Sequence, residues 1–447
     1  MNTDNPNAAL AMRIVDRLTR HGHEAFLVGG CVRDLLRRCE PDDYDIATSA
    51  RPEQVIALFP RTVAVGAKFG VVLVVDDGAQ AEVAAYRCES GYLDHRHPQI
   101  VEFSDARHDA LRRDFTINGL FMNPSSGEVF DFVGGRADIE TNIIRAIGDP
   151  RERFTEDALR LLRALRFSSS LEYDIEPGTW NALRALSHTI TEISAERVRD
   201  EIIKGFTRPH PGKFLDLLDR SGLLGILLPE AAATKGCRQP PEFHPEGDVY
   251  EHTKLMLAAL PPDPSPALAL AALLHDAGKP ATMQLADRIR FNNHHKAGAE
   301  MVEHIGRRLA FPNELRERVK AMVLRHMDFI NLTSMRKSTL RRFLAAPAIE
   351  EDIELHRADC LASHGDTSNC DYALRHLAEM RAESPEGKLP RPLVNGRDLI
   401  DMGLEPGPRF RVLLRAVQDA QLEGSVSGRE QALAMLKSLA LKPESPS

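Results

Sequence analysis

The sequence predicts an α+β protein in which a small N-terminal α/β head is followed by all-α segments. Between residues 24 and 135, short β-branched runs such as 71–75 alternate with turn residues and one helical stretch, 31–38. After Gly134-Gly135 the strand patterns stop. From about residue 150 onward, helical patterns of about 10 to 20 residues alternate with Pro and Gly.

The length and the Pro-rich seams predict several domains. A chain of 447 residues is expected to form about three domains, each with its own core. Pro-rich segments at 240–245 and 383–392 interrupt the helical patterns. We therefore expect a head, a helical neck with the start of the body, a second helical domain and a helical tail, with boundaries at 1–140, 141–240, 241–380 and 381–447.

The composition is that of an ordinary globular protein. The net charge of −8 argues against a protein that coats nucleic acid indiscriminately, although arginine-rich stretches at 151–166, 336–342 and 409–415 leave room for a local basic track. The chain has no apolar run of membrane-spanning length and begins with a polar segment, so we expect a cytoplasmic protein without membrane contact. The six cysteines lack CxxC spacing and are expected to be reduced thiols.

A glycine pair near the N-terminus is a candidate phosphate site. The predicted strand 26–28 runs through Gly29 and Gly30 into a helix that carries Arg33. Glycines at such a turn let backbone N–H groups approach a phosphate, and the helix N-terminus and Arg33 add positive charge. By itself the pattern also fits a plain tight turn.

Two aspartates that follow the glycine pair are the candidate catalytic centre. On a strand, Asp43 and Asp45 point to the same face, while Tyr44 and Ile46 point to the other. Close carboxylates repel unless a cation lies between them, and oxygen ligands select Mg²⁺ or Mn²⁺. Two such ions can activate a 3′-hydroxyl and stabilise a departing pyrophosphate. A solvated acidic turn is the alternative, which the preceding glycine pair disfavours.

Three further head features are candidates. Glu82 is expected to open a strand, either as a third carboxylate at the metals or as an exposed residue. Arg113 is a candidate triphosphate clamp, with a structural arginine as the alternative. The polar loop 91–98, which contains Asp94 and Arg96, is rich in functional groups and could touch substrate.

An arginine-rich helix is expected to begin at Thr155 as its N-cap. An ion pair between Asp157 and Arg160 would account for its spacing. The same two side chains can also select a base, because cytosine and adenine each present an exocyclic amine beside an unprotonated ring nitrogen. Guanine and uracil would leave polar groups mismatched, so an Asp-Arg pair favours C and A without a template.

A second candidate site lies in the helical part. An adjacent His-Asp pair is accompanied by histidines and an aspartate on other helical segments, namely His252, His275, Asp276, His294, His326 and Asp359. Imidazole and carboxylate ligands from several helices can bind one or two divalent transition metals and activate water. This stretch looks like an HD domain, the fold of metal-dependent phosphohydrolases. The alternative is an HD scaffold kept for its helices or for RNA binding.

The N-terminal motifs resemble class II tRNA nucleotidyltransferases (CCA-adding enzymes) and their relatives, the bacterial poly(A) polymerases. They occur in family order over about the first 200 residues, at 27–34, 43–49, 112–118 and 156–160. Departures are Gly119, where alanine is usual, and Asp131-Phe132-Val133-Gly134-Gly135 in place of Asp-Pro-Phe-Gly-Gly. Neither departure removes a functional group.

The resemblance implies a polymerase-beta-like nucleotidyltransferase head, a base-reading neck, and body and tail domains that grip tRNA. It implies Mg²⁺ on Asp43 and Asp45, and a loop around Asp94 and Arg96 that switches from C to A. Nucleotide contacts carried over from the family are Gly30, Arg33, Arg113, Asp157, Arg160, Arg163 and Arg166. The implied partners are tRNA, ATP and CTP.

Three alternatives remain at this stage. The same catalytic residues would support poly(A) addition or A-only addition. A different class is a phosphohydrolase or phosphodiesterase acting through the HD domain, with the head holding RNA. A third is a tRNA-binding protein without enzymatic activity. The oligomeric state does not follow from the sequence.

Overall fold

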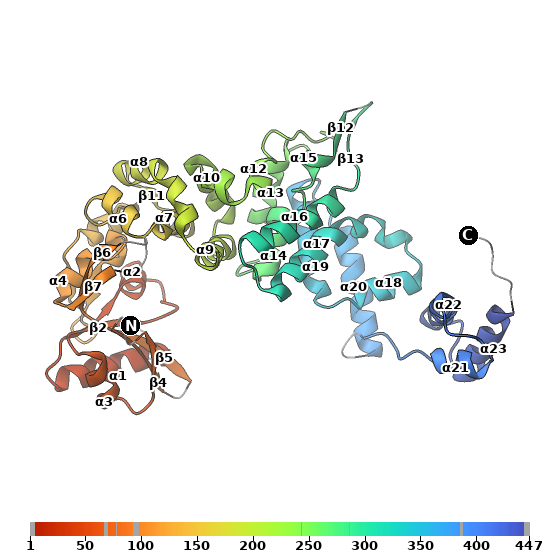
Figure 1. Ribbon diagram of the computed structural model, residues 1–447, viewed down its shortest axis with the longest axis horizontal. Coiled ribbons are helices and arrows are strands. Elements are labelled where there is room, and N and C mark those ends of the chain that lie inside the picture. Colours follow the sequence, from red (N-terminus) through yellow and green to blue (C-terminus); the bar gives the residue numbers. More distant parts are fainter. Residues whose placement is uncertain are drawn as a thin grey trace. The chain divides into compact units, whose positions relative to one another are not determined.

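The computed structural model describes residues 5–66, 70–76, 78–92, 98–242, 244–285, 287–384 and 388–441. The chain divides into two compact units, one formed by Met1–Ala233 with His304–Asn313 and the other by Thr234–Glu303 with Glu314–Ser447. The first unit holds the sheet, and the second is almost wholly helical (Figure 1). The α+β fold class predicted from the sequence is confirmed.

The head is built on a seven-stranded sheet with the order β3-β4-β5-β2-β1-β8-β9. Its strands are β1 (Ala25–Val28), β2 (Asp45–Thr48), β3 (Thr62–Gly66), β4 (Val71–Asp76), β5 (Ala79–Ala85), β8 (Leu120–Met122) and β9 (Val129–Asp131). Strands β2 and β5 pair in parallel, whereas the other neighbours pair antiparallel. Residues of β5 alternate between buried and more exposed positions, because successive side chains of a strand point to opposite faces.

Helices and one hairpin complete the head. They are α1 (Pro6–Arg20), α2 (Gly30–Leu36), α3 (Pro52–Leu58), β6 (Arg87–Tyr92), β7 (Pro98–Phe103), α4 (Ala106–Leu111), η2 (Thr116–Asn118) and α5 (Gly135–Glu140). Helices α1 and α3 contact each other and the sheet. The sequence patterns predicted only α2. They also placed Glu82 at the start of a strand, whereas β5 begins at Ala79 and Glu82 lies inside it.

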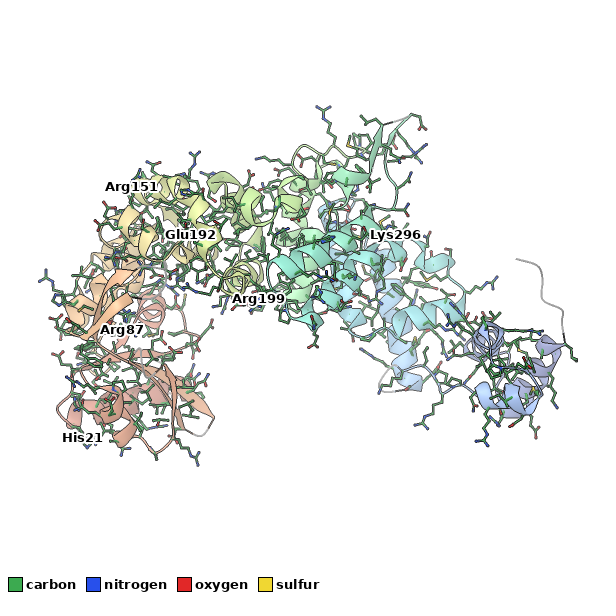
Figure 2. All side chains as sticks on the ribbon, viewed as in Figure 1. His21, Arg87, Arg151, Glu192, Arg199 and Lys296 are labelled. Atoms are coloured by element: carbon green, nitrogen blue, oxygen red, sulfur yellow. The ribbon has the colours of Figure 1, made fainter. Side chains whose placement is uncertain are left out.

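The neck and the start of the body follow within the first unit. Their elements are β10 (Ile143–Ile144), α6 (Pro150–Glu156), α7 (Leu159–Leu171), β11 (Asp174–Ile175), α8 (Pro177–Ala185), η3 (Ser187–Glu192), α9 (Ala195–Thr207), α10 (Pro211–Ser221), α11 (Leu223–Leu227) and α12 (Pro229–Ala232). The side chain of Arg199 on α9, labelled in Figure 2, donates to the carbonyl oxygen of Ala310. Arg308 pairs with Glu230, so both contacts tie 304–313 to this unit.

The predicted helix with Thr155 as its N-cap is wrong in detail. Asp149 caps α6 instead, its side chain accepting from the backbone N–H groups of Arg151 and Glu152, and Thr155 lies inside this helix. The helix ends at Asp157, whose backbone is extended, and α7 begins at Leu159. The chain therefore turns at the two residues between these helices, and the side chain of Asp157 is presented at a helix junction.

The second unit is a helical body followed by a helical tail. Its elements are α13 (Val249–Ala258), α14 (Pro266–Leu274), α15 (Lys279–Thr282), β12 (Met283–Leu285), β13 (Ile289–Phe291), α16 (His294–Arg308), α17 (Asn313–Arg325), η4 (His326–Ser334), α18 (Lys337–Leu344), α19 (Ile349–Ala362), α20 (Ser368–Glu383), α21 (Gly396–Asp401), α22 (Pro408–Glu423) and α23 (Arg429–Ala440). A separate apolar cluster that includes Leu399, Val417 and Leu436 forms the core of the tail. Beyond the predicted helices, this unit contains the small β12–β13 hairpin.

Two expectations from composition can be compared with the structure. All six cysteines are free thiols. Among the described residues, we find no helix with both the length and the apolar character that a membrane span requires.

The two departures from the family motifs meet in the head core. A Cβ atom on residue 119 would lie 2.7 Å from Cγ2 of Val133 and 3.1 Å from Cδ1 of Ile147. Valine is stiff at χ1, so the contact cannot relax cheaply. Gly119→Ala should therefore lower the free energy of unfolding by about 1–3 kcal/mol.

This coupling is measured with a double-mutant cycle in denaturant unfolding. Val133→Ala should recover part of the loss in the double variant, with a coupling energy of about 0.5 kcal/mol or more. Gly225→Ala is the matched control, because a Cβ there meets nothing within 4 Å and the residue lies in α11. A fully additive cycle would contradict the proposed contact.

Candidate active site and metal centre

One cavity of about 820 Å³ in the first unit gathers the residues that the sequence predicted for catalysis and nucleotide binding. The predicted residues that line it are Gly29, Gly30, Arg33, Asp43, Asp45, Glu82, Arg113, Asp157, Arg160, Arg163 and Arg166. They come from the head sheet, from the helices beside it and from the neck. Asp94 and Arg96, the loop residues predicted to switch the base, lie outside the described residues.

Asp45 opens β2 and Glu82 lies within the parallel strand β5, whereas Asp43, which the sequence placed on the same strand as Asp45, lies just before β2. Tyr44 and Ile46 are fully buried, whereas Asp43 is exposed and Asp45 is partly open, as the strand alternation predicts. Asp45 is the register partner of Glu82 across the β2–β5 pairing. Neighbouring positions on paired strands bring side chains within about 5 Å, so Glu82 lies beside Asp45.

The negative charge of Asp45 is poorly compensated by the rest of the protein. Burial, together with the negative charges of Glu82 and Asp43, raises the pKa of Asp45 to about 6, although Arg113 opposes the shift. A carboxylate whose pKa is raised by like charges is stabilised in its ionised form when a cation binds. The oxygen donors therefore fit divalent ions such as Mg²⁺.

Gly29 and Arg113 form the wall next to these carboxylates. Gly29 has φ = 77°, a conformation that favours glycine. A Cβ atom there would lie 3.2 Å from Nη1 of Arg113 and 3.9 Å from Oδ2 of Asp45. The guanidinium of Arg113 is held by Asp109, with Nη2 donating at 3.0 Å, and lies over the ring of Phe121. A fixed arginine beside a glycine turn suits phosphate oxygens.

A buried polar network joins the head to the neck. Nη1 of Arg33 donates to Oδ1 of Asn118 at 2.9 Å, and Nδ2 of Asn118 donates to Oδ1 of Asp114 at 3.3 Å. Asp114 also receives Nη2 of Arg163 at 2.6 Å. Burial would raise the pKa of Asp114, but Arg163 outweighs burial and holds the pKa at about 2. Asp114 is thus a permanent anion that orients Arg163.

The two predicted base-reading residues are paired separately. Nη1 of Arg160 donates to Glu156 at 2.7 Å, and Nη2 of Arg197 donates to Asp157 at 2.8 Å. The sequence allowed a direct ion pair between Asp157 and Arg160. In the structure, Asp157 pairs with Arg197 and Arg160 pairs with Glu156 instead. The reason is the break between α6 and α7, which removes the helical spacing on which that pair depended. Both side chains still line the cavity.

Sequence reasoning missed several residues of this network. Asp109, Asp114, Asn118 and Glu201 are buried and polar. Glu201 accepts from Nε of Arg166 at 2.7 Å. It lies on the buried face of α9, in one stripe with Val198, Ile202 and Gly205. A charged residue on an otherwise apolar stripe was a signal that could have marked it.

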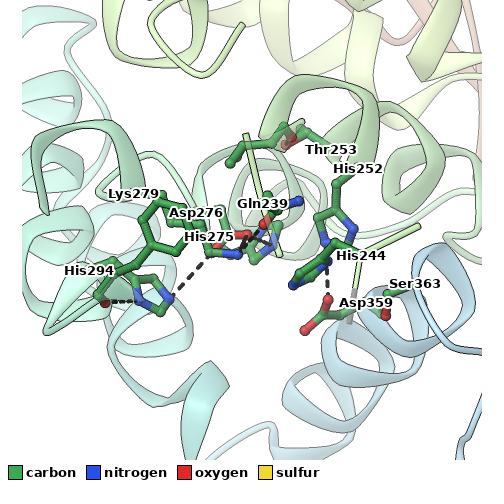
Figure 3. Close-up of polar contacts among 12 residues, drawn as sticks. Gln239, His244, His252, Thr253, His275, Asp276, Lys279, His294, Asp359 and Ser363 are labelled. Atoms are coloured by element: carbon green, nitrogen blue, oxygen red, sulfur yellow. Dashed lines mark hydrogen bonds and ion pairs between the residues drawn. The ribbon is translucent and has the colours of Figure 1, made fainter. Parts of the chain in front are cut away.

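The second unit brings the six predicted histidine and aspartate residues together. They form two groups whose ligand atoms lie within 4.8 Å of one another, His252, His275 and Asp359 in one and Asp276, His294 and His326 in the other. Figure 3 shows His294 and Asp359 at opposite ends of this cluster.

Several atoms of this cluster have only ion-pair contacts within the protein, such as Nε2 of His275 with Oδ2 of Asp276 at 3.1 Å. Nε2 of His252, Nε2 of His275 and Oδ1 of Asp276 are buried without a hydrogen bond in the described structure. Buried polar atoms without a hydrogen bond are costly, and imidazole nitrogens beside carboxylates suit divalent transition metals. The donor set therefore fits one or two such ions.

Neighbours that the sequence did not predict complete this centre. Nζ of Lys279 lies 2.6 Å from Oδ2 of Asp276 and donates to Oε1 of Gln239 at 2.6 Å. Glu246 accepts from His244 and His252. Gln239, His244 and Glu246 come from the segment before α13, where Pro-rich sequence gave no sign of a site.

Comparisons with known families match three consecutive regions of the chain. Residues 25–145 match "Poly A polymerase head domain", residues 172–235 match "Probable RNA and SrmB- binding site of polymerase A", and residues 248–363 match "HD domain".

Curated relatives include CCA-adding enzymes. The chain is 31% identical to that of Lactobacillus johnsonii over 430 residues, which cover 96% of each chain. It is 43% identical to that of Anoxybacillus flavithermus over 226 residues, 50% of this chain and 56% of the relative. The match to Geobacillus thermodenitrificans covers 53% of the relative. The alignment thus spans little more than half the length of the Anoxybacillus and Geobacillus relatives, but nearly the whole length of the Lactobacillus relative.

Solved structures show the same architecture. The structure of Bacillus stearothermophilus CCA-adding enzyme in complex with CTP aligns with a TM-score of 0.74 and 28% identity, covering 97% of this chain and 98% of the other. Thermotoga maritima CCA-adding enzyme complexed with tRNA_CCA aligns with a TM-score of 0.57 and 18% identity, covering 97% and 95%. The second likeness concerns the fold alone.

The network predicts a large cost for neutralising Asp114. Asp114→Asn removes the nearer of the two buried acids beside Arg163 and leaves only Glu201, at 3.8 Å, so it should reduce the free energy of unfolding by about 3 kcal/mol. Asp200→Asn is the matched control, since Asp200 pairs with Arg199 at a position 54% exposed; it should change stability by less than about 1 kcal/mol. Denaturant unfolding of the full chain measures both. Equal effects would argue against a buried ionic link.

Proposed function

The chain belongs to the family of CCA-adding enzymes, and we propose that it adds C and A from CTP and ATP to the 3′ end of tRNA without a nucleic-acid template. The observation that carries this function is the single cavity in which paired carboxylates, a glycine–arginine wall and the residues Asp157 and Arg160 lie together. The relative that matches 96% of its own length, a CCA-adding enzyme, supports the same activity.

The head is proposed to hold two Mg²⁺ ions on Asp43 and Asp45, with Glu82 beside them. A nucleotidyltransferase head implies dependence on divalent metal, and the oxygen donors and the raised pKa of Asp45 favour Mg²⁺. When bound, the ions would supply Lewis-acid activation of the 3′-hydroxyl and charge neutralisation at the leaving pyrophosphate.

The protein's own residues are proposed to bind and orient the nucleotide. The glycine turn at Gly29 and Gly30 leaves room for phosphate oxygens, and Arg113, fixed by Asp109, faces that turn. Arg33 and Arg163 are held in place by the network around Asp114. Because these arginines are anchored before substrate binds, little conformational entropy is lost when a triphosphate enters.

Base selection is proposed to rest on Asp157 and Arg160. A carboxylate that accepts from the exocyclic amine and an arginine that donates to the ring nitrogen suit cytosine and adenine alike. Asp157 and Arg160 have other partners in this structure, Arg197 and Glu156. Those partners keep the two side chains at the cavity, where a base could replace part of each contact.

Related activities use the same catalytic residues. Poly(A) addition or A-only addition would need the same metals and the same triphosphate wall. The curated relatives are CCA-adding enzymes, which favours addition of both C and A. The flexible loop around Asp94 and Arg96 is proposed to switch between the two bases.

Each domain is proposed to contact a different part of the substrates. The head (1–140) carries the metals, and the neck with the start of the body (141–240) reads the base and meets RNA. The tail (381–447) contacts tRNA. The match of 172–235 to an RNA-binding family supports the second assignment. Since tRNA is an intracellular substrate, we place the activity in the cytoplasm.

The helical domain (241–380) is proposed to be an accessory phosphohydrolase. Its HD match and its two ligand groups support a centre with one or two divalent transition metals. The metals would supply an activated water when bound. Lys279, anchored by Asp276 and Gln239, would present a positive charge to a phosphate group.

The metal assignment in the head is tested on tRNA that lacks its CCA end. Asp43→Ala with Asp45→Ala should lower incorporation of labelled CTP and ATP by at least about 1,000-fold, because metal stabilisation is worth several kcal/mol. Asp76→Asn, an exposed carboxylate paired with Arg13, is the control and should retain activity. Extension by the double variant would overturn the site. Long A tails on unrelated RNA, or no C incorporation by the native protein, would defeat CCA addition.

The selection model predicts a change in nucleotide preference rather than in rate alone. Asp157→Ala should lower the preference for CTP and ATP over UTP and GTP, measured as kcat/KM ratios, by about 10- to 100-fold. Glu152→Ala, an exposed residue of α6, should keep the native ratios. An unchanged ratio in the Asp157 variant would show that other residues read the base.

The two sites should be separable. His275→Ala with Asp276→Ala should abolish metal-dependent hydrolysis of a chromogenic phosphodiester, bis(p-nitrophenyl) phosphate, and leave nucleotide incorporation intact. His376→Ala, on α20 and paired with Glu379, serves as the control. Hydrolysis that persists in the double variant would argue that the HD centre is not its source.

A further inference from the structure

A short segment before the HD match supplies side chains to the proposed metal centre. The HD match begins at residue 248, whereas Glu246 and His244 precede it. The side chain of Glu246 is 5% exposed and that of His252 is fully buried. Two residues outside the matched region therefore pack against a candidate metal ligand.

The contacts converge on one carboxylate oxygen. Oε1 of Glu246 lies 2.7 Å from Nδ1 of His252 and 2.8 Å from Nδ1 of His244. The two imidazole rings meet edge to face, with centroids 5.1 Å apart. A carboxylate is a pure acceptor, so both Nδ1 atoms carry protons in these contacts.

This proton assignment fixes the other nitrogen of His252. With the proton on Nδ1, Nε2 is the nitrogen that can bind a metal ion, which takes the place of the Nε2 proton. That atom lies 3.1 Å from Oδ1 of Asp359 and belongs to the same ligand group as His275 and Asp359. Nε2 of His252 is thus directed at the other candidate ligands.

We propose that Glu246 is a positioning residue of the HD metal centre, which locks the His252 ring and its tautomer for metal binding while His244 holds the Glu246 carboxylate in place. The inference rests on the metal centre proposed above. A carboxylate behind a metal-bound imidazole orients the ring and raises its basicity, and loss of such a partner typically costs about 10- to 100-fold in metal affinity.

The test measures metal binding directly. Full-length protein carrying Asp43→Asn and Asp45→Asn, which silence the head, is stripped of metal and titrated with Co²⁺ by calorimetry and absorption spectroscopy. Glu246→Gln keeps the side-chain size but removes the charge, and should weaken Co²⁺ binding by about 10- to 100-fold and alter the d–d bands. His252→Ala should lose binding at least as strongly.

Two further variants keep the test decisive. Glu251→Gln is the matched control, because Glu251 lies next to His252 on α13, is half exposed and pairs with Lys254. The Co²⁺ affinity and the absorption spectrum of this variant should stay native. His244→Ala leaves the Glu246 charge in place and should weaken binding less than Glu246→Gln does. It covers the case in which the Glu246 variant fails to fold, as judged by circular dichroism.

The outcomes separate the inference from the function beneath it. Native affinity and spectrum in Glu246→Gln and His244→Ala, with impaired binding in His252→Ala, would overturn the positioning role and leave the metal centre standing. If binding does not depend on His252 or Asp276 at all, the metal centre itself fails, and the role of Glu246 fails with it. Addition of C and A by the same HD variants with an intact head stays native in either case.

Discussion

The first site is governed by the repulsion among carboxylates that the head sheet forces together. Parallel pairing of β2 with β5 places Asp45 opposite Glu82, and Asp43, just before β2, lines the same cavity. Burial and the negative charges of Glu82 and Asp43 raise the pKa of Asp45. Bound cations would stabilise these carboxylates in their ionised form. The surrounding glycine turn and arginines then suit a triphosphate.

Arginines at the cavity are held by a chain of buried acids rather than by solvent. Asp109 fixes Arg113, Asp114 fixes Arg163, and Glu201 fixes Arg166. Asp109 lies on α4, Asp114 in the loop after it and Glu201 on α9. The pair of Asp114 with Arg163 joins the head to the neck as well as shaping the cavity. In the second unit a buried acid likewise holds a site residue, since Glu246 accepts a hydrogen bond from His252.

The sequence predicted the parts of these sites that depend on local periodicity. The i, i+2 spacing was enough to bring Asp43 and Asp45 to one cavity, although only Asp45 lies on the predicted strand. The His-Asp pair with its distant partners was enough for the candidate HD ligands. The break between α6 and α7 was not predicted, because Asp149 caps a helix upstream of Thr155 and the chain turns at Asp157. Asp114, Glu201 and Glu246 were missed because their roles arise only from tertiary contacts.

The most direct test of the central claim is the position of Mn²⁺ in crystals grown with CTP, located by its anomalous scattering. The account predicts density within about 2 Å of carboxylate oxygens of Asp43 and Asp45 and next to the triphosphate. Density held by other residues, or carboxylates of Asp43 and Asp45 turned away from the nucleotide, would contradict it.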